Sequence, residues 1–274
     1  MNPRHAAAFA LGFLAMAAPI AHAQTQTQSQ SQTQTQPQPD EPGPDETNPP
    51  EPSAMPSNLD RLVAADSPLK SGQTIVFFGD SITQAGGYIR ILRDRLDADR
   101  PDLDVTLVNR GHSGYRVPMI RPLLQEEVLD MDPALVVIYI GINDVWHKAN
   151  GGGTTPEDFE AGLRDMIMRS HDAGVKVVLC SPSIIGEFPR GSNPLDADLE
   201  AYSAISRRVA AETGAVFCDL RTPFFEYLAE HKTDRSDRGV LTTDGVHMRP
   251  AGDELLIETM AGAIRAAMGA AMGG

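Results

Sequence analysis

A serine, a histidine and an aspartate stand in sequence patterns that are typical of a nucleophilic site. Ser81 follows the β-favouring run 74–78 through Gly79 and Asp80. Such a run, stopped by a glycine, predicts a buried strand that ends in a tight turn. Open α/β sheets bind their ligands just beyond the carboxyl ends of the strands, so Ser81 is placed like a nucleophile. The alternative is that Ser81 only caps the helix expected after it.

A nucleophilic serine needs a base, and the base needs an acid that orients it. The segment Asp244-Gly245-Val246-His247 contains both, three residues apart on an expected turn before Pro250. Asp244 could hold His247 in the tautomer that accepts the serine proton. The alternative is that Asp-Gly is an ordinary turn pair and that His247 is only a solvated side chain.

Strands that alternate with helices must position these residues. Apolar runs predict strands at 74–78, 105–108, 134–140, 175–179 and 215–217. Apolar positions at helical spacing predict helices over 88–96, 120–128, 156–173 and 199–209 and from Pro250 onward. Thr155 and Pro156 are typical of the start of one of them. The alternation predicts an α/β fold, a parallel sheet covered by helices on both faces.

Two further polar groups follow the second and third predicted strands. In a five-stranded sheet of order 2-1-3-4-5, the first strand lies between those two. Gly111 and Asn143 would then flank Ser81. A glycine N–H can approach a ligand unhindered, and an asparagine amide is a neutral donor. Together with the Ser81 N–H, these groups could form an oxyanion hole.

Four sequence blocks, in this order, resemble the blocks of the SGNH (GDSL-type) esterases and lipases. They are Gly79-Asp80-Ser81-Ile82, Asn109-Arg110-Gly111-His112-Ser113-Gly114, Gly141-Ile142-Asn143-Asp144 and Asp244-Gly245-Val246-His247. The first block departs from the family name at Ile82, which stands where that name has leucine. The resemblance implies a flavodoxin-like three-layer α/β/α sandwich. It also implies the triad Ser81, His247 and Asp244, oxyanion donors from Ser81, Gly111 and Asn143, and no metal or other cofactor.

The segment Asn143-Asp144-Val145-Trp146 is similar to the bacterial carbohydrate acetylesterases of that family, such as acetylxylan esterases. The resemblance implies that Trp146 lies beside the oxyanion hole, where it would line a small acyl pocket or stack on a sugar. The alternative is a core tryptophan beneath a loop.

The amino-terminal residues predict export. Arg4 and His5 precede the apolar run 6–20, and Ala21-His22-Ala23 is typical of a cleavage site, so 1–23 is interpreted as a signal peptide. Residues 24–58, rich in Gln, Thr and Pro, predict a disordered spacer. Residues 59–274 then form the hydrolase domain, secreted or periplasmic. No later apolar run is long enough for membrane insertion.

Composition excludes some classes of partner. The net charge is −14, and no lysine- or arginine-rich stripe appears, which argues against a nucleic-acid or anionic-membrane partner. Cys180 and Cys218 both lie in predicted strands, where two buried thiols are favoured over a disulfide. Nothing in the sequence indicates an oligomeric state.

These observations predict an exported serine esterase that removes short acyl groups, acetyl foremost, from a carbohydrate. One alternative keeps the chemistry and changes the substrate to longer acyl chains, as in a lipase, lysophospholipase or thioesterase. The other is a non-catalytic carbohydrate-binding protein on the same fold.

Overall fold

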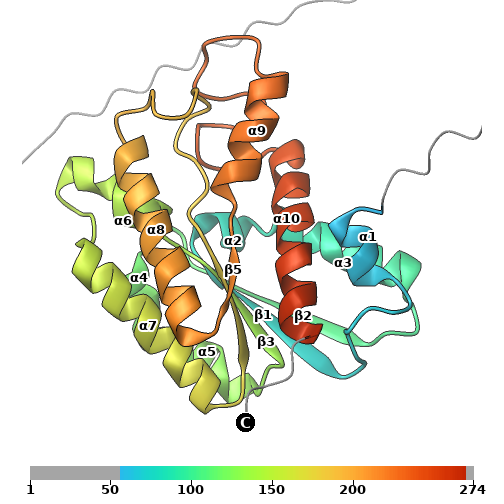
Figure 1. Ribbon diagram of the computed structural model, residues 1–274. Helices are drawn as coiled ribbons and strands as arrows, with labels where there is room; N and C mark the ends of the chain where they lie inside the picture. Colours follow the sequence, from blue (N-terminus) through green and yellow to red (C-terminus); the bar gives the residue numbers. More distant parts are fainter. Residues whose placement is uncertain (1–55, 270–274) are drawn as a thin grey trace, which may run out of the picture. The chain divides into compact units, whose positions relative to one another are not determined.

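A five-stranded parallel sheet forms the centre of the computed structural model, which describes residues 56–269 (Figure 1). Its order is β2-β1-β3-β4-β5, as predicted. The strands are β1 (Gln73–Gly79), β2 (Val105–Gly111), β3 (Leu135–Tyr139), β4 (Lys176–Cys180) and β5 (Val216–Cys218). In register, Gly79 at the end of β1 pairs with Gly111 of β2 and with Tyr139 of β3. The carboxyl ends of these three strands therefore lie side by side.

Helices cover both faces of the sheet, which gives the expected three layers. Figure 1 shows α7 and α8 on one side and α1, α3 and α10 on the other. The longer helices are α3 (Gly87–Asp99), α7 (Pro156–Asp172), α8 (Asp196–Thr213), α9 (Arg221–His231) and α10 (Pro250–Gly269). The short ones are α1 (Asn58–Val63), α2 (Ser81–Ala85), α4 (Val117–Ile120), α5 (Leu124–Glu127) and α6 (Ile142–Trp146). Turns of 3₁₀ helix span Arg121–Leu123, Leu129–Met131 and His147–Asn150.

The core lies between the sheet and these two helical layers. Every residue of β3 is buried, as are the last five residues of β1, because helices pack on both faces of the central strands. Helix α7 begins as predicted, with Thr155 accepting the Asp158 N–H and Pro156 in the first turn. Its apolar stripe faces the core. The buried members of that stripe are Phe159, Leu163, Met166 and Ile167.

Two predictions about the elements were wrong. The single helix expected over 120–128 is broken into α4, a 3₁₀ turn and α5, and Pro122 lies in that turn, where it lacks an N–H to donate. Strand β2 continues to Gly111, three residues beyond its expected end at Val108. The helices α1 and α9 were not predicted.

The folded domain begins slightly before its expected start at residue 59. Ser57 caps α1 by accepting the Asp60 N–H, and the Asn58 N–H donates to Glu258 of α10. The proposed signal peptide and residues 24–55 of the proposed spacer lie outside the described residues. Within residues 56–269, no helix combines the length and the apolar character that a membrane span requires.

Candidate active site

Ser81 is the first residue of α2, directly beyond the end of β1. The cap of α2 is Asp80, whose Oδ1 accepts the Ile82 N–H at 3.0 Å. The alternative interpretation of Ser81 as the helix cap is therefore wrong. The Ser81 hydroxyl is left free to bond a side chain from another part of the chain.

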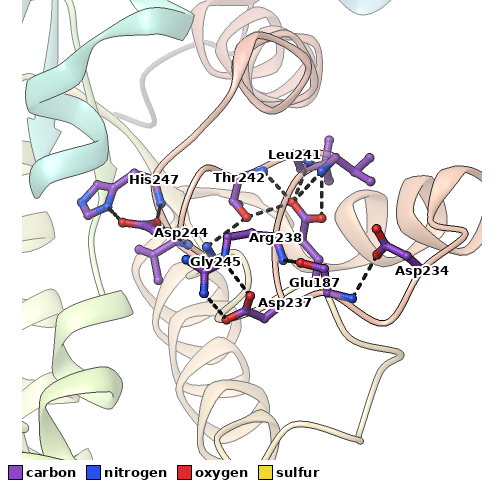
Figure 2. Close-up of polar contacts among 12 residues, drawn as sticks. Glu187, Asp234, Asp237, Arg238, Leu241, Thr242, Asp244, Gly245 and His247 are labelled. Carbon is purple, nitrogen blue, oxygen red and sulfur yellow. Dashed lines mark hydrogen bonds and ion pairs between the residues drawn. The ribbon is translucent and has the colours of Figure 1, made fainter.

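Ser81, His247 and Asp244 form a hydrogen-bonded chain. Ser81 Oγ lies 2.9 Å from His247 Nε2, and His247 Nδ1 lies 2.7 Å from Asp244 Oδ2 (the latter pair is drawn in Figure 2). When Nδ1 carries its proton toward the carboxylate, Nε2 is the acceptor for the serine proton. This geometry allows a histidine to activate a serine hydroxyl.

Asp244 is kept ionised by its own turn. Its Oδ1 accepts the N–H groups of Val246 and His247 at 3.0 and 2.8 Å. Partial burial raises the pKa of Asp244, but the hydrogen bonds from His247 and Val246 outweigh burial and hold that pKa below its usual value. The side chains of Asp244 and His247 remain 43% and 38% exposed, so a substrate can reach them from solvent.

Asn143 is buried near the start of α6, the helix that follows β3. Its Nδ2 donates to the Tyr115 carbonyl at 3.0 Å. A carboxamide carries two N–H groups, so one stays available to another acceptor. The bond to Tyr115 fixes the plane of the amide, and it also ties α6 to the loop after β2.

Gly111 differs from the expectation. Its N–H donates to Asn109 Oδ1 at 2.9 Å, so it is not available to an oxyanion. A Cβ at Gly111 would lie 2.0 Å from the Gln84 nitrogen, which shows that the glycine lets α2 pack closely on β2. The proposed oxyanion role of Gly111 is therefore not supported by this geometry.

Gly114, three residues later, is a better placed donor. It adopts a positive φ of 76°, and its N–H donates no hydrogen bond to any residue in the described part of the chain. The next residue is Tyr115, which holds Asn143. Gly114 is the last residue of the second sequence block, in which the oxyanion role was expected of Gly111.

Two buried carboxyl groups flank this region. Asp80 is fully buried, and its Oδ2 has no hydrogen-bond partner in the described structure. Burial, reinforced by the nearby Asp144 charge, raises the pKa of Asp80 to about 7 against the opposing hydrogen bond from Ile82. Burial also raises the pKa of Asp144 to about 6, although the Val117 N–H donates to it at 3.1 Å.

His112 has an acidic partner that sequence spacing did not reveal. Its Nε2 lies 2.6 Å from Glu127 Oε2, and its ring stacks on Tyr115 at a centroid distance of 4.9 Å. The His112 N–H also donates to the Gly79 carbonyl at the end of β1. His112 thus supports the loop that carries Gly114 and is not part of the hydrogen-bonded chain at Ser81.

Trp146 lies three residues after Asn143, at the end of α6, and is 36% exposed. The alternative of a core tryptophan is therefore wrong.

Cys180 and Cys218 are buried free thiols on paired positions of β4 and β5. Among residues 56–269, histidine, cysteine and acidic side chains do not gather in any group of three that could hold a metal ion.

Comparison with known proteins identifies the family. Residues 77–255 match the GDSL-like Lipase/Acylhydrolase family. The chain belongs to this family. It is accordingly a carboxylic ester hydrolase.

Curated relatives and solved structures agree with this assignment. The chain is 29% identical to an acetylxylan esterase of Geobacillus stearothermophilus, over 68% of this chain and 91% of that protein. It is 30% identical to the isoamyl acetate-hydrolyzing esterase 1 homolog of Mus musculus, over 66% of this chain and 77% of that protein. Its fold is similar to the crystal structure of the acetyl xylan esterase AlAXEase, with a TM-score of 0.67 and 35% identity, over 70% of this chain and 99% of that one.

Proposed function

We propose that this protein is an exported serine esterase that removes acetyl groups from a carbohydrate. The observation that carries the proposal is the hydrogen-bonded chain from Ser81 through His247 to Asp244, in a protein similar to acetylxylan esterases. Export rests on the sequence of residues 1–23 alone.

In the first half-reaction, Ser81 Oγ attacks the carbonyl carbon of the ester while His247 Nε2 takes the hydroxyl proton. Asp244 stabilises the imidazolium that forms. The tetrahedral intermediate collapses when His247 returns the proton to the leaving alkoxide, which departs as the sugar alcohol. In the second half-reaction, His247 deprotonates a water that attacks the carbonyl carbon of the acetyl-enzyme. The bond from that carbon to Ser81 Oγ then breaks, His247 returns the proton to Oγ, and the acetic acid leaves as acetate.

The negative charge on the carbonyl oxygen needs donors that are free in the resting protein. Three groups qualify: the N–H of Ser81, the N–H of Gly114 and the second Nδ2 proton of Asn143. The first is supported by the position of Ser81, since the first N–H groups of a helix have no partner within it. The other two are supported by the loop at Tyr115, which links them. Gly114 replaces Gly111 in this proposal.

The preference for a carbohydrate acetate is supported by Trp146. An exposed indole on the same short helix as Asn143 offers an apolar face to a sugar ring. A longer acyl chain would need an apolar cavity at Ser81. The described structure does contain an apolar cavity of about 900 Å³, but its lining residues lie on the β4–α8 loop, α9 and the loop after it, and include neither Ser81 nor Trp146.

Release of acetate from acetylated xylo-oligosaccharides and simple sugar acetates tests this proposal, with Ser81→Ala as the inactive control. A chain-length series of p-nitrophenyl esters tests the acyl group: we expect the highest kcat/KM at acetate, and a maximum at octanoate would favour a lipase or thioesterase. Covalent labelling by a fluorophosphonate tests catalysis itself. An unlabelled wild-type protein would favour the non-catalytic carbohydrate-binding alternative.

A further inference from the structure

Glu187, in the loop between β4 and α8, is a buried acid that belongs to none of the four sequence blocks. It is only 2% exposed. Its carboxylate accepts three consecutive backbone N–H groups, those of Val240, Leu241 and Thr242, at 2.6–3.2 Å. These donors all come from the segment that leads into Asp244.

The contacts of Glu187 reach the residue next to Asp244. Glu187 Oε1 accepts the Thr242 hydroxyl at 2.8 Å, and Thr242 Oγ1 in turn accepts the Gly245 N–H at 3.2 Å. The neighbouring Gly186 N–H donates to the Gly245 carbonyl at 2.7 Å. The backbone N–H of Gly245 is thereby held by Thr242, which Glu187 bonds, and its carbonyl is held directly by the β4–α8 loop. Figure 2 shows this series of contacts running from Glu187 through Thr242 toward Asp244 and His247.

A cation balances the buried charge. Lys232, at the end of α9, places Nζ 3.0 Å from Glu187 Oε2 and 2.9 Å from Asp234. Burial by itself raises the pKa of Glu187, but the Val240 N–H, Lys232 and Thr242 outweigh it and hold that pKa below its ordinary value. Glu187 is therefore ionised at neutral pH, and its contacts weaken only on acidification below the ordinary glutamate pKa.

We propose that Glu187, with Thr242 as its relay, is a positioning residue for the Asp244–His247 pair. The proposal rests on the proposed triad. Segment 240–248 closes on itself through a bridge between Thr242 and Met248, and through the Thr243 N–H donating to the His247 carbonyl. A shift of Thr242 is for this reason transmitted to both Asp244 and His247. Because activation of Ser81 requires a contact of about 3 Å, a small displacement of His247 lowers turnover.

The test uses two kinds of variant in the full-length protein. Thr242→Val removes the hydroxyl relay and keeps the volume, while Thr242→Ser keeps the hydroxyl. Glu187→Gln keeps an oxygen for the Thr242 donors but turns an amide donor toward Lys232. Glu258→Gln is the matched control, because Glu258 also accepts two backbone N–H groups, at Asn58 and Leu59, on a segment that carries no proposed site residue.

For Thr242→Val and Glu187→Gln we expect kcat on p-nitrophenyl acetate to fall roughly 10- to 100-fold with KM changed less than about twofold. Fluorophosphonate labelling of Ser81 should slow in parallel. The downfield proton resonance of the His247–Asp244 hydrogen bond should shift or broaden. Thr242→Ser and Glu258→Gln should keep wild-type kcat even where their melting temperatures fall.

Unchanged kcat and an unchanged His247 resonance in a folded Thr242→Val protein would overturn the positioning role, and so would an equal loss of kcat in Glu258→Gln. If Glu187→Gln does not fold, the kcat and the His247 resonance of Thr242→Val alone decide whether the positioning role holds. A wrong carbohydrate substrate would not affect this test, because p-nitrophenyl acetate and the fluorophosphonate require only an activated Ser81. Failure of the substrate proposal is therefore distinguishable from failure of the positioning role. A wild-type protein that reacts with neither reagent would overturn both proposals.

Discussion

Replacing Asp80 by asparagine should make the protein more stable at alkaline pH. Asp80 is fully buried beside the proposed nucleophile, with one oxygen bonded to the Ile82 N–H and the other without a partner in the described structure. Asparagine matches the shape of the protonated acid and keeps the acceptor for Ile82. It cannot acquire the buried charge that an unpaired carboxylate brings.

The magnitude follows from the pKa of Asp80. Burial first, and then the Asp144 charge, raise this pKa to about 7, whereas an unfolded aspartate titrates near 3.9. Below the unfolded pKa both states are protonated and the group has no effect. As the pH rises toward 7, only the unfolded state releases its proton, so stability is lost by about 1.4 kcal/mol per pH unit. The total cost in the wild type above pH 7 is about 4 kcal/mol.

Urea unfolding at pH 5, 6, 7 and 8, followed by circular dichroism, measures this effect. The free energy of unfolding of Asp80→Asn minus that of the wild type should grow by about 2.3 kcal/mol from pH 5 to pH 7 and then level off. Asp144→Asn is the matched variant: its gain should level off near pH 6, where burial has raised the pKa of Asp144. A difference that is flat across this range, or that shrinks as the pH rises, would refute the reasoning.

Three further predictions concern the proposed mechanism. Ser81→Ala and His247→Ala should each lower kcat on p-nitrophenyl acetate by roughly 10⁴-fold with the circular dichroism spectrum unchanged; near-wild-type activity in either would remove the triad. Asn143→Ala should lower kcat about 10²- to 10³-fold with little change in KM, since its amide meets full negative charge only in the transition state; a rise in KM alone would make it a substrate-binding residue. Trp146→Ala should raise KM for acetylated xylo-oligosaccharides and leave p-nitrophenyl acetate kinetics intact, and equal effects on both substrates would argue against sugar stacking.

The central strands and their order could be predicted because they are buried on both faces. β1, β3 and β4 are continuous apolar runs, and this pattern distinguishes strands of a covered parallel sheet from exposed ones. Strand β2 lies at the sheet edge. Its last residues include Asn109 and Arg110, whose polarity is typical of a loop, so residue types alone do not predict that the strand continues to Gly111.

This strand extension explains why the geometry does not support the oxyanion role expected of Gly111. Sequence order showed only that a glycine follows the second apolar run. With β2 reaching Gly111, that residue pairs with Gly79 and packs under Gln84, and the loop that carries free donors begins after it. The hydrogen bond from the Gly111 N–H to Asn109 is local, but the residue types do not show that Gly111, and not Gly114, is the glycine whose N–H is already bonded.

Contacts between distant segments were also beyond the sequence. Glu127 and His112 are 15 residues apart and meet across a broken helix, and Glu187 reaches Thr242 over 55 residues. The Asp244–His247 contact could be predicted because three residues on one turn keep both side chains together. Contacts between separate loops depend on the tertiary structure of the whole domain, and the hydrophobic periodicity of the sequence does not encode that structure.

The topology explains why the acid and base segment needs an anchor of its own. Ser81 follows β1, and Gly114 and Asn143 follow the two strands that are hydrogen-bonded to β1, so sheet register places all three. The segment with Asp244 and His247 lies between α9 and α10 and follows no strand of the sheet. Backbone register cannot set its position to the few tenths of an ångström that a contact with Ser81 requires. The buried carboxylate of Glu187, which extends from the loop after β4, performs that task by bonding the segment to a neighbouring strand end.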